Sequence, residues 1–329
     1  MKQRIFITLL LLVLLLASCG QTAQPPAQSG SQSADQSQPA AVSSEEGKIT
    51  FTDALGQDFS IDPPQRAVVM IGSFADVWVL AGGEDVLAAT ANDAWESYAL
   101  DLPEDTANIG SPMKPNVELV LGAEPDLIIA SSLSPSNLEL QETFQRAGIP
   151  AAYFDVSSFQ DYLDLLELFT RLAGHLENYE TYGTAVKDQV DGAVKRMAVN
   201  NFTPTVLTIQ VSGSSVKVKN SRDNVLGPIL ADLGCVNIAD RDGSLLEDLS
   251  LETILQADPD FIFAVYHGTD ETAAQANLEE SLLSNPAWAS LGAVEGGRFH
   301  ILERRMYSLK PNALWGDAYE QLADILYGD

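Results

Sequence analysis

The sequence predicts an α/β protein with two similar Rossmann-like lobes, each built around a mostly parallel sheet and joined by one long spine helix. Residues 116–130 (NVELVLGAEPDLIIA) align without a gap with residues 250–264 (SLETILQADPDFIFA), so one structural unit occurs twice. Residues 66–91 read as strand–helix–strand, the order of a parallel sheet. Residues 157–203 contain no proline, which permits a helix long enough to join two lobes.

Each copy of the repeat predicts a short helix, a turn and a buried strand. Asn116 and Ser250 stand at the two N-cap positions. Glu118 and Glu252 place an acid in each first turn. A Pro-Asp turn and a short apolar strand follow in both copies. Two similar lobes commonly close on a ligand in the cleft between them, so we expect the binding site there.

The N-terminus predicts export from the cytoplasm. Two positive charges precede an apolar run at residues 5–17, which is too short to span a bilayer comfortably and is typical of a signal peptide. Residues 16–20 (LASCG) resemble a bacterial lipobox, in which Cys19 would be lipidated; an ordinary signal peptide that happens to contain a cysteine is the alternative. We therefore expect a lipoprotein signal peptide at residues 1–19. The polar residues 20–47 would form a flexible tether to the folded part.

Charge and cysteine content exclude several classes of protein. The formal net charge of −28 disfavours nucleic acid or an anionic bilayer surface as a partner. Cys235 is the only cysteine besides Cys19, which argues against a fold held together by disulfides.

In the first lobe, residues 48–173, the candidate ligand residues follow strands or lie in loops. Ser73 and Phe74 open a helix at the predicted carboxyl edge of the sheet, although a plain N-cap is the commoner role of such a serine. Trp95 lies in a loop, where it either lines a flat ligand or covers the core. Met113 lies between two prolines, which would present it rigidly, although methionine usually fills a core.

The spine is expected at residues 174–203, with one helix from about His175 to Val199 after an amphipathic helix at residues 159–173. We expect His175 to lie on the surface of that helix. The second lobe, residues 204–329, should end in an amphipathic helix at residues 311–327 that covers its sheet.

Histidines of the second lobe differ in their expected roles. His267 follows a buried strand at the carboxyl edge of the sheet, where ligand residues gather, and imidazole is the commonest metal ligand. His300 alternates with apolar residues inside a strand and is expected to be structural.

The lipobox, the polar tether, the hairpin sequence TDALGQ, both repeats and the single long spine together resemble the substrate-binding lipoproteins of ABC importers for iron-siderophores, haem and cobalamin, which have the class III fold. The resemblance covers residues 48–327. Within that family, residues 110–115 (GSPMKP) and 266–268 (YHG) look like the haem receptors of the iron-regulated surface determinant systems of Gram-positive bacteria.

That resemblance implies haem as the transported ligand, with Met113 and His267 as the axial ligands of its iron. A thioether and an imidazole tune the potential of haem iron rather than open a catalytic position. The candidate donors to the haem propionates are the amides of residues 73–75, Lys114, Arg222, Arg304 and Arg305. Tyr266, like Ser73, Phe74 and Trp95, is a candidate for the pocket wall. Propionate docking stays unassigned at this point.

The main alternative keeps the fold and replaces haem with a ferric siderophore or a corrinoid. A catecholate siderophore calls for clustered cations. The sequence offers Lys114, Lys217, Lys219, Arg222, Arg304 and Arg305. A zinc or manganese receptor would need more histidines than the three present. An enzyme is not expected, because the sequence lacks the G-x-S-x-G, P-loop, G-x-G-x-x-G and H-E-x-x-H motifs.

The resemblance also implies partners and a place in the cell. Glu118 and Glu252 would each dock on one subunit of an ABC permease dimer that works with its ATPase, although an acid in a first helical turn is also favourable by itself. The lipid on Cys19 would hold a monomeric protein at the extracytoplasmic face of the cell membrane.

Overall fold

The first five-stranded sheet has the order β5-β4-β3-β8-β9, and all four of its pairings are parallel. We describe a computed structural model of the chain over residues 47–199, 202–247 and 249–328. The predicted signal peptide, Cys19 and the tether up to residue 46 lie outside these residues. The strands of the first lobe are β1 (Ile49–Thr52), β2 (Asp58–Ile61), β3 (Ala67–Val69), β4 (Leu87–Thr90), β5 (Ala107–Asn108), β6 (Gly110–Ser111), β7 (Lys114–Pro115), β8 (Leu127–Ser131) and β9 (Ala151–Phe154).

Helices cover both faces of this sheet, because its strands are apolar on both sides. Val69 and Ile129 point into one core, and Val68 and Ile128 point into the other. The predicted hairpin forms from β1 and β2. The helices are α1 (Gly72–Leu80), η1 (Glu84–Val86), α2 (Asp93–Glu96), α3 (Val117–Gly122), α4 (Pro135–Leu138) and α5 (Gln141–Ala147).

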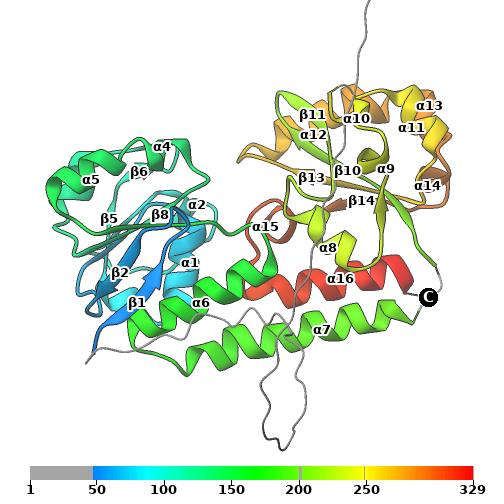
Figure 1. The fold of residues 1–329 in the computed structure, drawn as a ribbon. Helices are drawn as coiled ribbons and strands as arrows, with labels where there is room; N and C mark the ends of the chain where they lie inside the picture. Colours follow the sequence, from blue (N-terminus) through cyan, green and yellow to red (C-terminus); the bar gives the residue numbers. More distant parts are fainter. Residues whose placement is uncertain (1–46, 200–201, 248, 329) are drawn as a thin grey trace, which may run out of the picture. The chain divides into compact units, whose positions relative to one another are not determined.

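The second sheet has the order β11-β10-β13-β14, and β12 also pairs with β10. Only the β10–β11 pairing is antiparallel, so this sheet is mostly parallel as well. Its strands are β10 (Thr205–Ser212), β11 (Ser215–Lys219), β12 (Val236–Asn237), β13 (Phe261–Tyr266) and β14 (Phe299–Leu302). The helices are α8 (Leu226–Asp232), α9 (Ile238–Arg241), α10 (Ser244–Glu247), α11 (Leu251–Ala257), α12 (Glu271–Leu278), η3 (Glu279–Leu283), α13 (Pro286–Ala289), α14 (Gly292–Glu295), α15 (Arg304–Tyr307), η4 (Asn312–Leu314) and α16 (Trp315–Tyr327). The predicted α/β fold with two mostly parallel sheets is confirmed (Figure 1).

Both copies of the sequence repeat fold into the same local structure, a capped helix followed by a turn and a strand. Asn116 accepts hydrogen bonds from the Glu118 and Leu119 amides at 3.0 and 3.3 Å, and Ser250 accepts one from the Thr253 amide at 3.2 Å, so both predicted N-caps are confirmed. The aspartate after each helix then ties the start of its strand to the neighbouring strand of the same sheet, β3 in the first lobe and β10 in the second. Asp126 accepts from the amide of Gln65 at 2.7 Å, and Asp260 accepts from the amide of Thr205 at 2.7 Å.

Two helices connect the two lobes. The first has the bounds that the sequence predicted, and the second does not. α6 (Phe159–Ala173) has the predicted bounds and ends at Gly174, whose φ of 81° only glycine adopts freely. The second helix begins later than expected, with the π-helical turn η2 (Glu180–Thr184) before α7 (Ala185–Ala198). His175 therefore lies in the turn before the spine helix instead of on it, but it is exposed as expected and contacts Glu177.

The C-terminal helix α16 packs along α7 (Figure 1). A Cβ atom at Gly316 would lie 2.2 Å from the Gln189 side chain, so the absence of a side chain lets the two helices approach closely. Buried side chains of α16, including Trp315 and Tyr319, share one core with Phe261 of the second sheet. The predicted C-terminal helix thus buries an apolar face against α7 and that sheet.

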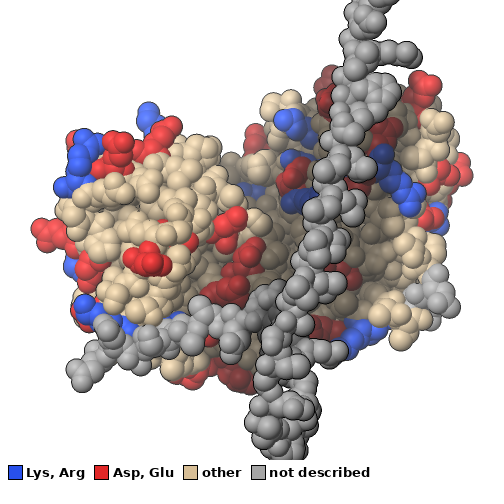
Figure 2. Space-filling model, viewed as in Figure 1, with Lys and Arg blue, Asp and Glu red and all other residues tan. Residues whose placement is uncertain are grey.

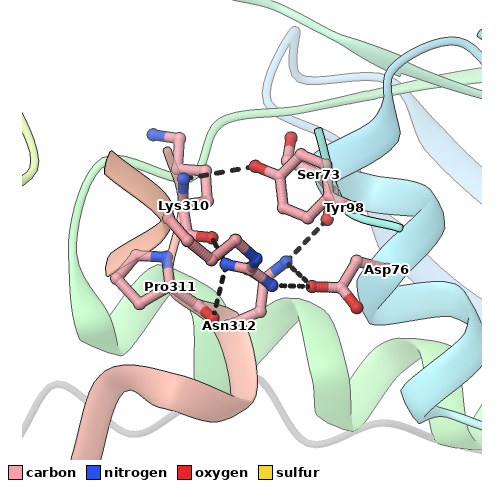
Figure 3. A network of polar contacts seen from close by, with 7 residues as sticks. Ser73, Asp76, Tyr98, Lys310, Pro311 and Asn312 are labelled. Carbon is pink, nitrogen blue, oxygen red and sulfur yellow. Dashed lines mark hydrogen bonds and ion pairs between the residues drawn. The ribbon is translucent and has the colours of Figure 1, made fainter. Parts of the chain in front are cut away.

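A segment near the C-terminus, residues 304–312, binds back onto the first lobe (Figure 3). Arg305 donates to the Asp76 carboxylate at 2.8 Å and to the carbonyl oxygens of Lys310 and Pro311. Asn312, buried and held at a φ of 57°, donates to the Ser73 carbonyl at 2.9 Å and to Asp76 at 2.8 Å. We use the name crossover network for the following residues: Ser73, Asp76, Arg305, Lys310, Pro311, Asn312 and Tyr98, whose ring lies below the Arg305 guanidinium.

Removing the Asp76 carboxylate should strongly destabilise the protein. The side chains of Asp76 and Arg305 are only 11% and 22% exposed, so Asp76→Ala would leave a largely buried guanidinium without its anion. We expect the free energy of unfolding to fall by about 3 kcal/mol, measured by urea denaturation followed by circular dichroism. Arg146→Ala is the control. Arg146 pairs with Glu142, but the two side chains are 76% and 87% exposed, so this ion pair should contribute almost nothing to the free energy of unfolding. Equal effects of the two substitutions would contradict this reading of the network.

Candidate functional site

Met113 lies at the tip of the tight turn between β6 and β7, with 76% of its surface exposed. The peptide bond before Met113 is held through both of its polar groups. The Met113 amide donates to the Ser111 hydroxyl at 3.3 Å, and the Pro112 carbonyl accepts from the Ser136 hydroxyl at 2.7 Å. The thioether is therefore presented on a fixed backbone, and the common role of methionine as a core filler does not apply.

His267 follows β13 at the carboxyl end of the strand, as predicted. Its amide donates to the Val211 carbonyl at 2.7 Å, and its ring atom Nδ1 lies 3.2 Å from the Ser308 hydroxyl. This contact orients the ring, and Nε2 has no hydrogen-bond partner among the residues described. Partial desolvation lowers the pKa of His267, and the charges of Arg304 and Lys219 add to this shift. A neutral, oriented imidazole with one open nitrogen is suited to bind a metal.

A cavity of about 470 Å³ opens beside Ser308, the residue that contacts His267. This volume lies in the range of small-molecule sites. Its wall combines residues of the first lobe, of the loop before α8 and of the α15 region. The lining residues are Leu133, Ser157, Gln210, Arg222, Asp223, Asn224, Val225, Tyr307, Ser308 and Lys310.

Cations gather on the second-lobe side of this cavity. Arg222 lies in its wall, and Lys217 and Lys219 lie nearby on β11. Figure 2 shows Lys and Arg side chains over the part of the second lobe that Figure 1 labels β11 and α8. Within the described ranges, no carboxylate lies within ion-pair distance of these three side chains. Asp223 also lies in this wall, with its carboxylate accepting from the Asn220 side chain, but the three cations outnumber it, so this side of the cavity is suited to an anionic ligand.

Lys310 is a cavity residue that the sequence analysis missed. Its side-chain nitrogen donates to the Val156 carbonyl, and burial lowers its pKa, while Asp155 and Asp161 oppose that shift. The only sequence signal was a lysine directly before Pro311, between the last strand and the last helix. That signal does not distinguish a cavity lysine from a surface lysine.

Several predicted pocket residues do not line this cavity. Ser73 and Phe74 are buried inside α1, and the helix begins after Ile71, so Ser73 is not its N-cap. The amides of residues 74 and 75 donate to the Ile71 carbonyl, and the Gly72 amide donates to Asp93 at 2.9 Å. The amides of residues 74 and 75 therefore cannot serve as propionate donors, because their hydrogen bonds are already made.

The two predicted arginines of α15 differ: Arg305 is engaged in an ion pair, whereas the buried Nε of Arg304 has no hydrogen-bond partner among the described residues. Arg305 is bound within the crossover network, which corrects its assignment as a ligand donor. Arg304 donates to the Ser97 hydroxyl at 3.4 Å. Trp95 is half-buried against the first core, and Tyr266 is half-buried against the second core. Lys114 is exposed beside Met113, outside the wall of the cavity.

Glu118 and Glu252 are both exposed in the first turns of α3 and α11, so both are accessible to a partner.

Burial raises the pKa of Cys235 to about 12, which keeps its thiol unreactive. Within residues 47–199, 202–247 and 249–328, no three His, Cys, Asp or Glu side chains converge as metal ligands. In the same ranges, no helix has the length and apolarity needed to cross a bilayer.

Comparison with known proteins gives relatives along almost the whole chain. The putative ABC transporter substrate-binding lipoprotein YhfQ of Bacillus subtilis is 23% identical, over 94% of this chain and 93% of the relative. The high-affinity heme uptake system protein IsdE of Staphylococcus aureus is 23% identical, over 69% of this chain and 76% of the relative. The solved structure of S. aureus SirA with staphyloferrin B aligns with a TM-score of 0.63 at 20% identity, over 85% of this chain and 97% of that chain.

These likenesses confirm the class III fold of substrate-binding proteins that the sequence predicted. The model of the periplasmic binding protein family matches residues 68–305, which is most of the chain and spans both sheets. The chain therefore belongs to the periplasmic binding protein family.

Proposed function

We propose that this protein is the extracytoplasmic substrate-binding lipoprotein of an ABC importer and that it captures haem, with Met113 and His267 as axial ligands of the iron. The observation that carries the proposal is the pair of side chains itself. An exposed thioether on a fixed turn and an exposed imidazole oriented by Ser308 come from different lobes, and neither contributes to a core. The family and the names of YhfQ and IsdE support the transport role.

The chemistry of this pair fits capture better than catalysis. Sulfur and imidazole nitrogen together occupy both axial positions of a haem iron, so no coordination position stays open for a reaction. A ligand that bonds to both lobes also favours the arrangement in which both donors reach it. Haem is thus the cargo of the proposed site, not a resident cofactor.

The second candidate is an anionic ferric siderophore. The observation that favours it is the group of Lys217, Lys219 and Arg222, which have no carboxylate partner in the described parts of the chain. The likeness to SirA solved with staphyloferrin B is compatible with this candidate. Haem also carries two carboxylates, so the cations alone do not separate the two ligands.

Replacing either axial ligand should change the haem spectrum. With haemin, the wild type should show a low-spin Soret spectrum, because two strong axial donors hold the iron. Met113→Ala and His267→Ala should each convert this spectrum to a high-spin form and weaken binding by at least about tenfold, since each substitution removes one iron bond. Absorption spectra and titrations of the purified variants give both readouts.

His175→Ala is the matched control, because His175 is an exposed histidine in the turn after α6, where its ring contacts Glu177, and its loss should leave the spectrum unchanged. The axial assignment is wrong when both alanine variants keep the wild-type spectrum and affinity. Tryptophan quenching by a ferric catecholate or carboxylate siderophore at nanomolar concentration, without any response to haemin, would decide for the second candidate.

We infer that Glu118 and Glu252 dock the protein on the permease. The two carboxylates occupy equivalent exposed positions in the two copies of the repeat, which suits a partner made of two similar subunits. Carboxylates at such a surface pair with arginines of the partner and guide association.

The double variant Glu118→Ala/Glu252→Ala should bind haemin normally and fail in transport. Each acid contributes only about 0.3–1 kcal/mol to its own helix, so the fold should persist. The measurement is haem uptake into proteoliposomes that contain the cognate permease and ATPase. Glu139→Ala/Glu280→Ala, two exposed acids outside the repeat helices, should transport normally. Normal uptake by the first double variant would exclude docking through these residues.

The lipid anchor is proposed from the lipobox at residues 16–20 and the lipoprotein name of YhfQ. Lipid chains contribute about 0.8 kcal/mol for each buried CH₂ group, enough in combination to hold the protein at the membrane. Cys19→Ala should therefore move the protein from the membrane fraction to the medium or periplasm, as followed by fractionation and immunoblotting. Mass spectrometry of the wild-type N-terminal peptide that finds no lipid on Cys19 would disprove lipidation there.

A further inference from the structure

We propose that Lys310 and Arg222 bind the two acidic groups of the ligand, one each, and that Lys310 thereby selects a dicarboxylate over a neutral macrocycle. This inference rests on haem as the proposed ligand and assigns its propionates. Lys310 and Arg222 are the two basic residues in the cavity wall.

The two cations enter the wall from separate parts of the chain. Arg222 belongs to the loop between β11 and α8, and its backbone amide is fixed by the Asn220 side chain at 2.8 Å. Lys310 belongs to the segment after α15, which binds the first lobe. A ligand with two separate carboxylates matches two separately placed cations, whereas a neutral ligand leaves both without a new partner.

The crossover network positions Lys310. The backbone amide of Lys310 donates to the Tyr98 hydroxyl at 3.2 Å, and its carbonyl accepts from Arg305 at 2.8 Å. Both main-chain groups are thus used inside the network, and the side-chain nitrogen points away from it (Figure 3). A lysine with a fixed backbone loses less entropy when it binds a ligand, which makes it a better anion site than a surface lysine.

The surroundings of the ammonium favour a new anionic partner. The Lys310 nitrogen has one hydrogen-bond acceptor, the Val156 carbonyl, although an ammonium has three donors. Asp155 and Asp161 lie near enough to influence its charge, but neither forms an ion pair with it in the described ranges. Burial weakens the hydration of the ammonium, so a carboxylate in the cavity would gain a strong charge-assisted contact.

The test compares haemin with its dimethyl ester, which has the same macrocycle and iron without free carboxylates. The variants are Lys310→Met, Arg222→Met and the double variant, with Lys195→Met as control, because Lys195 is an exposed lysine of α7 outside the cavity wall. Each single substitution should weaken haemin binding by about 10- to 100-fold. Affinity for the ester should change by less than about threefold, which also verifies that the variants are folded.

The outcomes separate this inference from the proposed function. A preference for haemin over the ester that disappears in the double variant, with the low-spin spectrum kept, supports the assignment. Haemin binding with an unchanged preference in the double variant overturns it and leaves the axial ligands intact. A wild-type protein that binds neither haemin nor its ester overturns haem as the ligand and this assignment together.

Discussion

The ion pair between Arg305 and Asp76 is the interaction on which the site depends most. A guanidinium with this little exposure is costly to leave unpaired, so the segment that carries it stays bound to the first lobe although it follows the last strand of the second sheet. The same arginine closes the turn at residues 310 and 311 through two carbonyl oxygens. One buried charge therefore fixes the backbone of Lys310 and the approach of the chain to α16.

This attachment gives the cavity a wall that neither sheet supplies by itself. Ser308, from the same segment, contacts the His267 ring, while Lys310 faces Val156 of the first lobe. The imidazole of one lobe and a cation near the other are thus held through a few residues of one short segment. Met113, in contrast, is held only by contacts inside its own lobe, through Ser111 and Ser136. The two proposed iron ligands therefore have independent supports.

The sequence predicted those features of the fold that depend on residues close together in the chain. Apolar periodicity gave the bounds of α6, and the ungapped repeat gave both N-caps and the place of His267 after a buried strand. It did not predict the fate of Arg305 or the role of Lys310, because their partners lie far away in the sequence, at Asp76 and Tyr98. The amides of residues 74 and 75 were misjudged for a local reason: the helix begins earlier than expected, after Ile71, so both amides donate to the Ile71 carbonyl.

The attraction of an anionic ligand to this acidic chain depends on the positions of its few cations. The net charge of −28 repels an anionic ligand at long range, but at physiological salt that field decays over about 8 Å. Contacts at the cavity wall must then supply the attraction, and their strength increases as water is excluded. Exposed Arg222 keeps most of its hydration, whereas half-buried Lys310 has already lost part of it. Because that loss occurs on folding, Lys310 has less hydration left to lose when it meets a carboxylate, and it should contribute more to selection than Arg222 does.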